Sequence, residues 1–360
     1  MFKDLSRRHF LAGSTAAAGA LALGGRTALG ADPLKVGFVY VGPVGDFGWT
    51  HGHDLGRKAV EKEFGDKVKT TFVENVAEGP DAERVIRQLA TSGNKLIFTT
   101  SFGFMNQTEK VAKQFPDVKF EHATGFKTAP NMSAYNARFY EGRAVIGTIA
   151  GHVTKTGKFG YIASFPIPEV VMGINAFILA ARKVRPDAEI KVVWVNSWYD
   201  PGKEADATKA LIDQGCDVIT QHTDSPAPVQ TAASRGAWCF GQASDMTTFA
   251  PDHHATAILD VWAPYYIERV KAVMDGTWAT SNVWYGFKEG MVEMAPYNKK
   301  LPAEAVAAAE AVRKDIVAGK LHPFEGPIND QSGAEKIPAG QTIPDGDLLG
   351  MDWYVEGVSA

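Results

Sequence analysis

The chain is poor in cysteine and has no surplus of basic residues. Its 360 residues include two cysteines, Cys216 and Cys239, and they lack the paired spacing of a zinc site. Lysine and arginine number 37 against 41 aspartates and glutamates, and no basic run is present. Nucleic-acid binding needs clustered positive charge to displace phosphate counterions, so we expect no nucleic-acid partner.

Long hydrophobic stretches are also missing. The apolar run between Leu11 and Leu23 is about a dozen residues, whereas a membrane-spanning helix needs roughly twenty. Arg7 and Arg8 precede this run and the small residues 28–30 follow it, a pattern typical of a twin-arginine export signal over residues 1–30. An ordinary N-terminal helix or a membrane anchor is the alternative.

Export has consequences for the rest of the chain. We expect the mature protein to begin near Ala31 and to work in the periplasm without a lipid, since no cysteine lies near the predicted cut. Without residues 1–30, which carry three more positive than negative charges, the net charge changes from −4 to −7. The periplasm would permit a disulfide between Cys216 and Cys239, but two buried free thiols are the favoured interpretation.

Motifs of common enzymes and cofactor sites are absent from the sequence. The glycines after the first predicted strand fall at 42, 45 and 48, which matches neither G-x-G-x-x-G nor a P-loop, and no G-x-S-x-G elbow occurs. The pairs His51/His53 and His253/His254 do not share a helix face, so they do not form a metal site. We therefore expect no cofactor, no metal and no catalytic activity.

Short apolar segments alternate with amphipathic ones, which predicts parallel sheets covered by helices on both faces. The pattern occurs twice. Strands are predicted at 34–41, 68–73, 95–100 and 118–122, and again at 159–164, 190–195, 217–220 and 237–240. Residues 255–274 read as one long helix, 283–287 as a strand and 302–318 as a helix.

These two units predict two lobes of an α/β fold. We expect an N-terminal lobe of residues 31–125 plus about 250–280 and a C-terminal lobe of residues 126–249 plus about 281–360. The later segments would cross back to complete both lobes. Several crossing segments form a hinge, and closure of such a hinge around a ligand is a known behaviour.

Aromatic residues follow several predicted strands. In open α/β sheets the loops at the carboxyl ends of the strands line the ligand crevice, so aromatic faces from both lobes would form a slot for a flat ring. The aromatic candidates are Trp49, Phe102, Phe104, Phe165, Trp198 and Tyr199. Some of them could instead pack beneath the loops.

Polar residues lie close to these aromatic residues in the sequence. A flat heterocycle needs hydrogen-bond partners at its edge, because an unpaired buried polar group costs about 1–3 kcal/mol. The polar candidates are Asp46, Ser101, His122, Thr124, Asp224, Gln242 and Asp245. Asp46 and Asp245 could equally be helix caps or turn residues.

The order of several short motifs resembles the basic membrane protein family of periplasmic substrate-binding proteins, whose best-understood members are purine nucleoside receptors of ABC importers. The similarity covers nearly the whole mature chain. The motifs are Lys35–Val39, Asp46-x-x-Trp49 leading to Gly56, Asn106–Phe120, Tyr140–Gly142 with Gly147 and Gly151, Gly157–Tyr161, and Gly215–Ile219. The resemblance implies a type I periplasmic-binding-protein fold, with two Rossmann-like lobes joined by a three-stranded hinge.

The resemblance also implies a ligand and partners. It predicts a protein that captures a purine-type base or nucleoside and delivers it to an ABC permease in the inner membrane. We also expect this protein to be a monomer. In nucleoside receptors aromatic residues sandwich the base, and one of them corresponds to Trp49. An acidic residue and a lysine hold the ribose; these positions correspond to Gln242 and about Asp260, so neither matches. This difference favours a free base slightly, although a shift in the alignment would give Asp245 the acidic role.

Two alternatives remain open at this point. A periplasmic enzyme acting on a small planar heterocycle would explain export of a folded protein, and it would show turnover. A sensory protein would pass the ligand signal to a membrane receptor instead of a permease.

Overall fold

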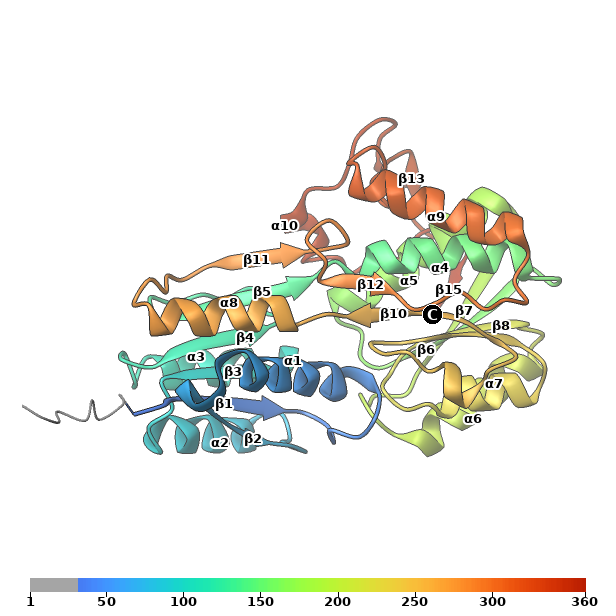
Figure 1. The fold of residues 1–360 in the computed structure, drawn as a ribbon. Helices are drawn as coiled ribbons and strands as arrows, with labels where there is room; N and C mark the ends of the chain where they lie inside the picture. The colour runs from blue at the N-terminus through green and yellow to red at the C-terminus, as the bar shows by residue number, and fades with distance from the viewer. Residues whose placement is uncertain (1–31) are drawn as a thin grey trace, which may run out of the picture. The chain divides into compact units, whose positions relative to one another are not determined.

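Short buried strands alternate with helices along the chain, as the sequence predicts. The computed structural model describes residues 32–360, and the predicted signal over residues 1–30 lies outside this range. The strands form two predominantly parallel sheets with helices packed on both faces (Figure 1). The α/β class predicted from the sequence is therefore correct.

The N-terminal lobe contains a six-stranded sheet in the order β11-β5-β4-β3-β1-β2, in which every neighbouring pair is parallel. Its strands are β1 (Leu34–Tyr40), β2 (Val68–Val73), β3 (Leu96–Thr100), β4 (Lys119–Ala123), β5 (Met132–Ala137) and β11 (Asn282–Tyr285). Its helices are α1 (Gly48–Phe64) with α8 (Ala263–Met274), and α2 (Pro80–Thr91) with α3 (Met105–Ala112). Val36 and Phe38 pack in the core beneath α1 and α8, whereas Val39 packs with α2 and α3, as alternation along a strand requires.

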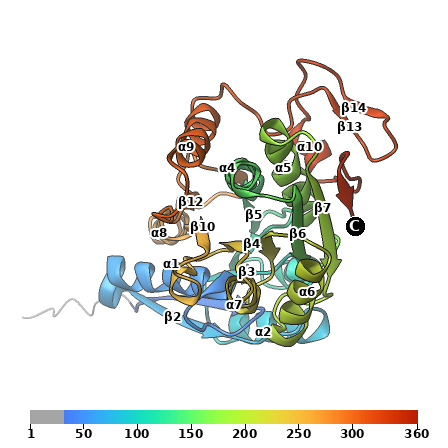
Figure 2. The ribbon, with the colours of Figure 1, turned by 90° about the vertical axis from the view of Figure 1, so that its right-hand side faces the viewer.

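The C-terminal lobe contains a seven-stranded sheet in the order β12-β10-β9-β8-β6-β7-β15. Its strands are β6 (Lys158–Ala163), β7 (Glu189–Trp194), β8 (Val218–His222), β9 (Trp238–Gly241), β10 (His254–Asp260), β12 (Val292–Met294) and β15 (Val358–Ser359). Helix α4 (Phe139–Val153) packs between α5 (Pro168–Val184) and α9 (Ala303–Val317), while α6 (Pro201–Asp213) packs with α7 (Ala227–Ser234) (Figure 2). A small hairpin of β13 (Ile328–Asn329) and β14 (Glu335–Ile337) and helix α10 (Asp345–Leu348) belong to the C-terminal segment.

Three chain segments connect the two lobes. They run from β5 into α4, from β10 into α8, and from β11 into β12. This is the three-stranded hinge that the family resemblance implies.

Sheet membership differs from the predicted lobe boundaries at three strands. β5 and β11 pair within the N-terminal sheet, although the boundaries at 126 and about 281 assign them to the other lobe. β10 pairs with β9 in the C-terminal sheet, although the range 250–280 assigns it to the N-terminal lobe. The reason is that each crossing follows a strand that has already paired with its own sheet.

The predicted helix over residues 255–274 is wrong in its first part. Residues 254–260 form β10, whose side chains are almost all buried between β9 and β12, and α8 begins only at Ala263. Pro264 in the first turn of α8 suits a helix start. Burial between two strands thus outweighs the helical preference of the alanines at 255 and 257.

Cys216 and Cys239 are both buried free thiols, as predicted. Between residues 32 and 360, none of the helices combines the length and the apolar character needed to cross a bilayer.

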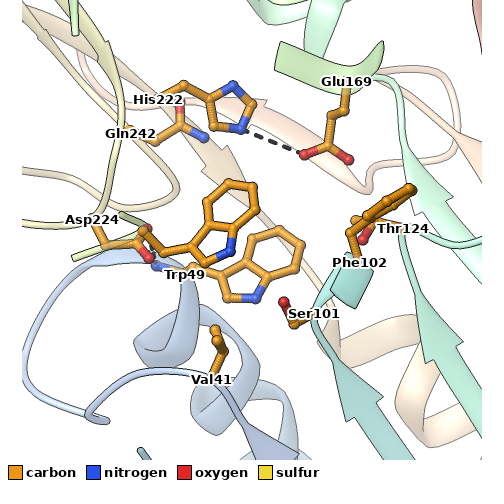
Figure 3. Close-up of a pocket in the computed structure, with 10 residues that line it drawn as sticks. Val41, Trp49, Ser101, Phe102, Thr124, Glu169, His222, Asp224 and Gln242 are labelled. Carbon is orange, nitrogen blue, oxygen red and sulfur yellow. Dashed lines mark hydrogen bonds and ion pairs between the residues drawn. The ribbon is translucent and has the colours of Figure 1, made fainter. Parts of the chain in front are cut away.

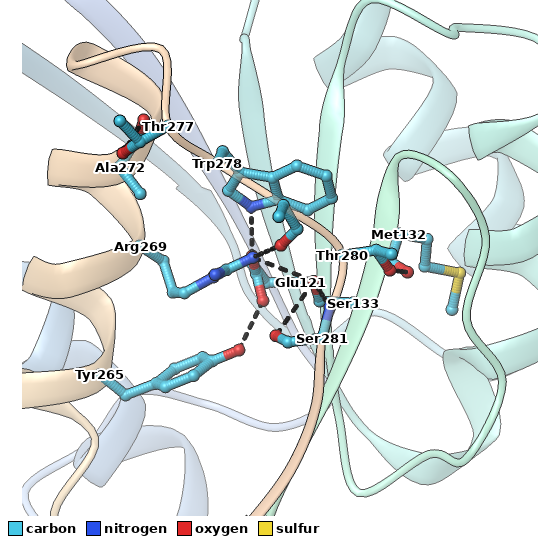
Figure 4. A network of polar contacts seen from close by, with 11 residues as sticks. Glu121, Met132, Ser133, Tyr265, Arg269, Ala272, Thr277, Trp278, Thr280 and Ser281 are labelled. Atoms are coloured by element: carbon cyan, nitrogen blue, oxygen red, sulfur yellow. Dashed lines mark hydrogen bonds and ion pairs between the residues drawn. The ribbon is translucent and has the colours of Figure 1, made fainter.

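A buried ion pair links α8 to the N-terminal sheet (Figure 4). The carboxylate of Glu121 in β4 is fully buried and accepts hydrogen bonds from Arg269 Nε at 2.6 Å, Tyr265 OH at 2.7 Å and Trp278 Nε1 at 2.6 Å. Arg269 also donates to Ser133 Oγ at 3.0 Å. Burial raises the pKa of Glu121, and the positive charge of Arg269 opposes that rise.

We expect Arg269→Met to lower the free energy of unfolding by about 3–5 kcal/mol, because it leaves the Glu121 carboxylate buried without its counter-ion. Urea denaturation followed by circular dichroism measures this change. The control is Arg185→Met, which breaks the exposed pair Arg185–Asp187 and should leave stability nearly unchanged. Equal effects of the two substitutions would contradict the assignment.

Candidate functional site

The carboxyl ends of strands from both lobes border a cavity whose empty space, including the part open to solvent, is about 390 Å³ (Figure 3). The N-terminal lobe contributes Val41, Trp49, Ser101, Phe102 and Thr124, and the C-terminal lobe contributes Glu169, Trp198, His222, Asp224 and Gln242.

Trp49, in the first turn of α1, is held from behind by other aromatic residues. Its ring meets His53 edge-on at 4.4 Å between centroids and Trp262 at 5.4 Å, and its Nε1 donates to Thr100 O at 2.7 Å. His53 is fully buried and stacks on Trp262, and burial lowers its pKa well below the usual value, so it is neutral. These contacts fix the indole, which still borders the cavity.

Trp198 borders the cavity from the opposite lobe. Its ring packs against Phe165 at 5.1 Å between centroids, and its Nε1 donates to Glu78 Oε1 at 3.3 Å. The same oxygen of Glu78 accepts from Ser101 Oγ at 2.5 Å. Glu78 therefore connects the two lobes at one edge of the site.

The structure brings together most of the residues predicted for the site. Trp49, Ser101, Phe102, Thr124, Trp198, Asp224 and Gln242 all line the one cavity. Phe165 does not line it and instead supports Trp198 from behind.

Asp46 and Asp245 do not lie with the others. Both are exposed, and they border a second cavity, which residues of α1, of the loop after β9 and of the connection from β10 to α8 line. Asp245 Oδ1 accepts from the backbone N of Thr247 at 2.9 Å, which is the turn role that the sequence left open. Phe104 and His122 are buried inside the N-terminal lobe, where His122 Nδ1 lies 2.9 Å from Thr99 Oγ1. Tyr199 lines a smaller neighbouring cavity.

The sequence did not indicate Val41, Glu169 or His222 as site residues. Glu169 lies in the first turn of α5, and its Oε1 is 3.4 Å from His222 Nε2. Burial lowers the pKa of His222, and the nearby Glu169 acts in the opposite direction. His222 could have been found, because it ends β8, but the predicted strand stopped at residue 220.

Asp224 caps helix α1 from the opposite lobe. The N-cap residue of α1, Phe47, provides no side-chain cap, and the N–H of Trp49 donates to Asp224 Oδ1 at 3.1 Å. The N–H of Gly48 donates to Ser244 Oγ at 2.7 Å. Helix N-termini leave their first N–H groups unpaired, so the C-terminal lobe supplies the missing acceptors.

Carboxyl groups concentrate around this part of the molecule. Burial raises the pKa of Asp224 to about 7, with a hydrogen bond from Trp49 opposing the rise and Glu204 adding to it. Both carboxyl oxygens of Asp260 are buried and have no hydrogen-bond partner among residues 32–360. Burial, together with the charges of Glu169 and Asp224, raises the pKa of Asp260 well above its usual value.

The family model and the similar curated proteins point to the same family. The family model described as ABC transporter substrate-binding protein PnrA-like matches residues 34–323 and confirms the resemblance to the basic membrane protein family. A purine-binding protein of Brucella abortus is 62% identical over 327 residues, which cover 91% of this chain and 93% of the relative. A putative ABC transporter glucose-binding protein of Haloferax volcanii is 37% identical, over 82% of this chain and 75% of the relative.

Solved structures agree on the fold. An ABC transporter solute-binding protein of Aeropyrum pernix matches with a TM-score of 0.69, over 88% of this chain and 95% of that chain, at 20% identity. This similarity supports the periplasmic-binding-protein fold.

We expect Asp224→Asn to change how stability depends on pH. Between pH 4 and 7 the unfolded chain has ionised this carboxyl while the folded protein retains its proton, so rising pH destabilises the wild type. Asparagine keeps the acceptor for Trp49 but cannot ionise. One pKa unit corresponds to about 1.4 kcal/mol and Asp224 keeps some contact with water. The wild type should therefore lose about 2 kcal/mol relative to Asp224→Asn over this range.

Urea denaturation of both proteins at pH 4, 5, 6 and 7 measures this difference. Other titrating groups are common to the two proteins, so their effects largely cancel. Parallel stability curves would refute the raised pKa of Asp224.

Proposed function

Because this chain belongs to the PnrA-like family of ABC transporter substrate-binding proteins, we propose that it captures a purine in the cavity between its lobes and delivers it to a membrane permease. In this proposal it binds its ligand without chemical change. Residues 1–30 would direct its export to the periplasm, where it acts as a monomer without a lipid anchor.

The observation that carries the proposal is the placement of two tryptophans on one cavity from opposite lobes. Trp49 belongs to α1 and Trp198 follows β7, so a ring between them would contact both lobes at once. Each aromatic stack contributes roughly 0.5–1.5 kcal/mol beyond the area it buries. A planar ligand would thus favour the closed arrangement of the lobes over the open one.

The polar lining supports a heterocycle over a plain hydrocarbon ring. Ser101 and Thr124 offer hydroxyl groups from the N-terminal lobe, and Asp224 and Gln242 offer a carboxyl and an amide from the C-terminal lobe. A purine carries ring nitrogens and exocyclic groups around its edge that pair with such partners. The name of the Brucella abortus relative, a purine-binding protein, supports the same ligand class.

We propose a free base as the favoured ligand over a nucleoside. The positions that hold ribose in nucleoside receptors of this family correspond to Gln242 and about Asp260. An amide replaces the acid there, and a buried carboxyl without a hydrogen-bond partner among residues 32–360 replaces the lysine. Ribose hydroxyls would then lack their usual partners, at about 1–3 kcal/mol for each unpaired group.

Isothermal titration tests the ligand class. We expect adenine, hypoxanthine or guanine to bind the wild type and D-glucose to give no heat. Trp49→Ala should weaken purine binding at least about thirtyfold, because it removes one face of the slot. The control is Trp238→Ala in β9, a half-buried tryptophan outside the cavity, which should leave the affinity unchanged. No heat and no thermal shift with any purine base or nucleoside would refute the proposal.

Titration of matched base and nucleoside pairs tests the preference. We expect adenine to bind at least about tenfold more tightly than adenosine, and hypoxanthine likewise more tightly than inosine, since a loss of about 1.4 kcal/mol corresponds to tenfold. Tighter binding of the nucleosides would place ribose in the site and contradict the preference for a base.

A further inference from the structure

Arg143 in α4 is fully buried, yet its hydrogen bonds go to neutral groups. Its Nη1 donates to Thr220 Oγ1 at 3.1 Å, and its Nη2 donates to Gln242 Oε1. The guanidinium lies over the ring of Tyr161 at 5.2 Å, and its Nε has no hydrogen-bond partner among the described residues. Asp260 and Glu169 interact electrostatically with Arg143, but its hydrogen bonds go to Thr220 and Gln242 instead. The direction of those bonds therefore needs an explanation beyond the pairing of a buried charge.

The bond to Gln242 fixes the direction of that side-chain amide. A guanidinium has donors only, whereas a glutamine amide has an acceptor oxygen and a donor NH₂ group. Arg143 can therefore bind only the oxygen, and the NH₂ group must point elsewhere. Gln242 lines the cavity, and in Figure 3 its amide nitrogen lies on the side of the cavity.

Two carboxyls and an imidazole accompany Gln242 on the C-terminal side of the cavity. Burial raises the pKa of Asp224 to about 7, so below that pH its carboxyl offers a hydroxyl donor as well as an acceptor, whereas Glu169 provides carboxyl oxygens. His222 is neutral, and the neighbouring Glu169 Oε1 assigns its proton to Nε2, which leaves Nδ1 as an acceptor without a partner among residues 32–360. The amide of Gln242 is therefore a donor on this wall that does not depend on pH.

We infer that Arg143 is a positioning residue that makes Gln242 a fixed hydrogen-bond donor. The pocket then selects planar ligands that carry a lone-pair acceptor, a ring nitrogen or a carbonyl oxygen, at the edge that meets Gln242. This inference rests on the proposed function, because it takes the cavity as the ligand site.

Analogue titration on two proteins tests the inference. The parent probe is the purine base that binds the wild type most tightly. The other probes are analogues of this base that each lack one lone-pair acceptor. A deaza analogue replaces one ring nitrogen by C–H, and a further analogue lacks the 6-oxygen where the parent base has one. We expect the wild type to lose at least about tenfold in affinity for one of these analogues. In Arg143→Met the drop in affinity for that analogue should be less than about threefold. Without Arg143 the amide of Gln242 can rotate, so its NH₂ group no longer keeps a fixed position toward the ligand.

The control is Thr220→Val, which removes the other hydrogen-bond partner of Arg143. In this variant the drop in affinity from the parent base to the critical analogue should be as large as in the wild type. A merely structural role of Arg143 would weaken all probes equally and leave their ratios unchanged. Such unchanged ratios in Arg143→Met, or a wild type that tolerates every analogue, would overturn the inference.

Gln242→Glu provides a second test that keeps Arg143 and holds even if Arg143→Met does not fold. Its carboxylate pairs with Arg143 and offers only acceptors to the cavity. We expect it to bind the parent base at least about tenfold more weakly than the wild type does, and to lose the discrimination against the critical analogue. If this variant keeps the wild-type ratio of affinities for the parent base and the critical analogue, the inference is overturned.

These outcomes are distinct from failure of the proposed function. If the wild type binds no purine, the proposed function fails. If it binds a purine but the ratios do not respond to Arg143 or Gln242, only the role of Arg143 fails.

Discussion

The first turn of α1 is shared between the lobes, and the geometry of the site depends on it. Phe47 provides no cap, so the N–H groups of Gly48 and Trp49 donate to Ser244 and Asp224 in the other lobe. The same turn carries the indole that borders the cavity. These two hydrogen bonds thus join the lobes at the turn that carries one wall of the site.

Most of the fold could be predicted from the sequence because the sheets are largely parallel and buried. Strands such as β1, β3 and β6 read as short apolar runs, and their carboxyl ends predict where the site lies. β5 was not predicted, since its buried positions include Ser133 and Asn136. β10 was predicted as helix, since its alanines favour helix locally and only the neighbouring strands show that they are buried.

The site was predicted in part, for a related reason. Residues directly after a strand, such as Ser101 and Thr124, have a position that the strand pattern fixes. Glu169 lies on a helix, and its approach to His222 depends on the packing of α5 against the end of β8. Asp46 and Asp245 follow strands by several residues, and they are exposed beside a different cavity, which residue type alone does not indicate.

Position 48 does not line the cavity, yet few residues other than glycine can occupy it. Its φ of +83° favours glycine, and a Cβ added there would lie 2.8 Å from the carbonyl oxygen of Asp224. Any larger residue would act as a wedge between the lobes. Position 48 therefore limits how closely the two lobes can approach, although it has no side chain with which to touch a bound molecule.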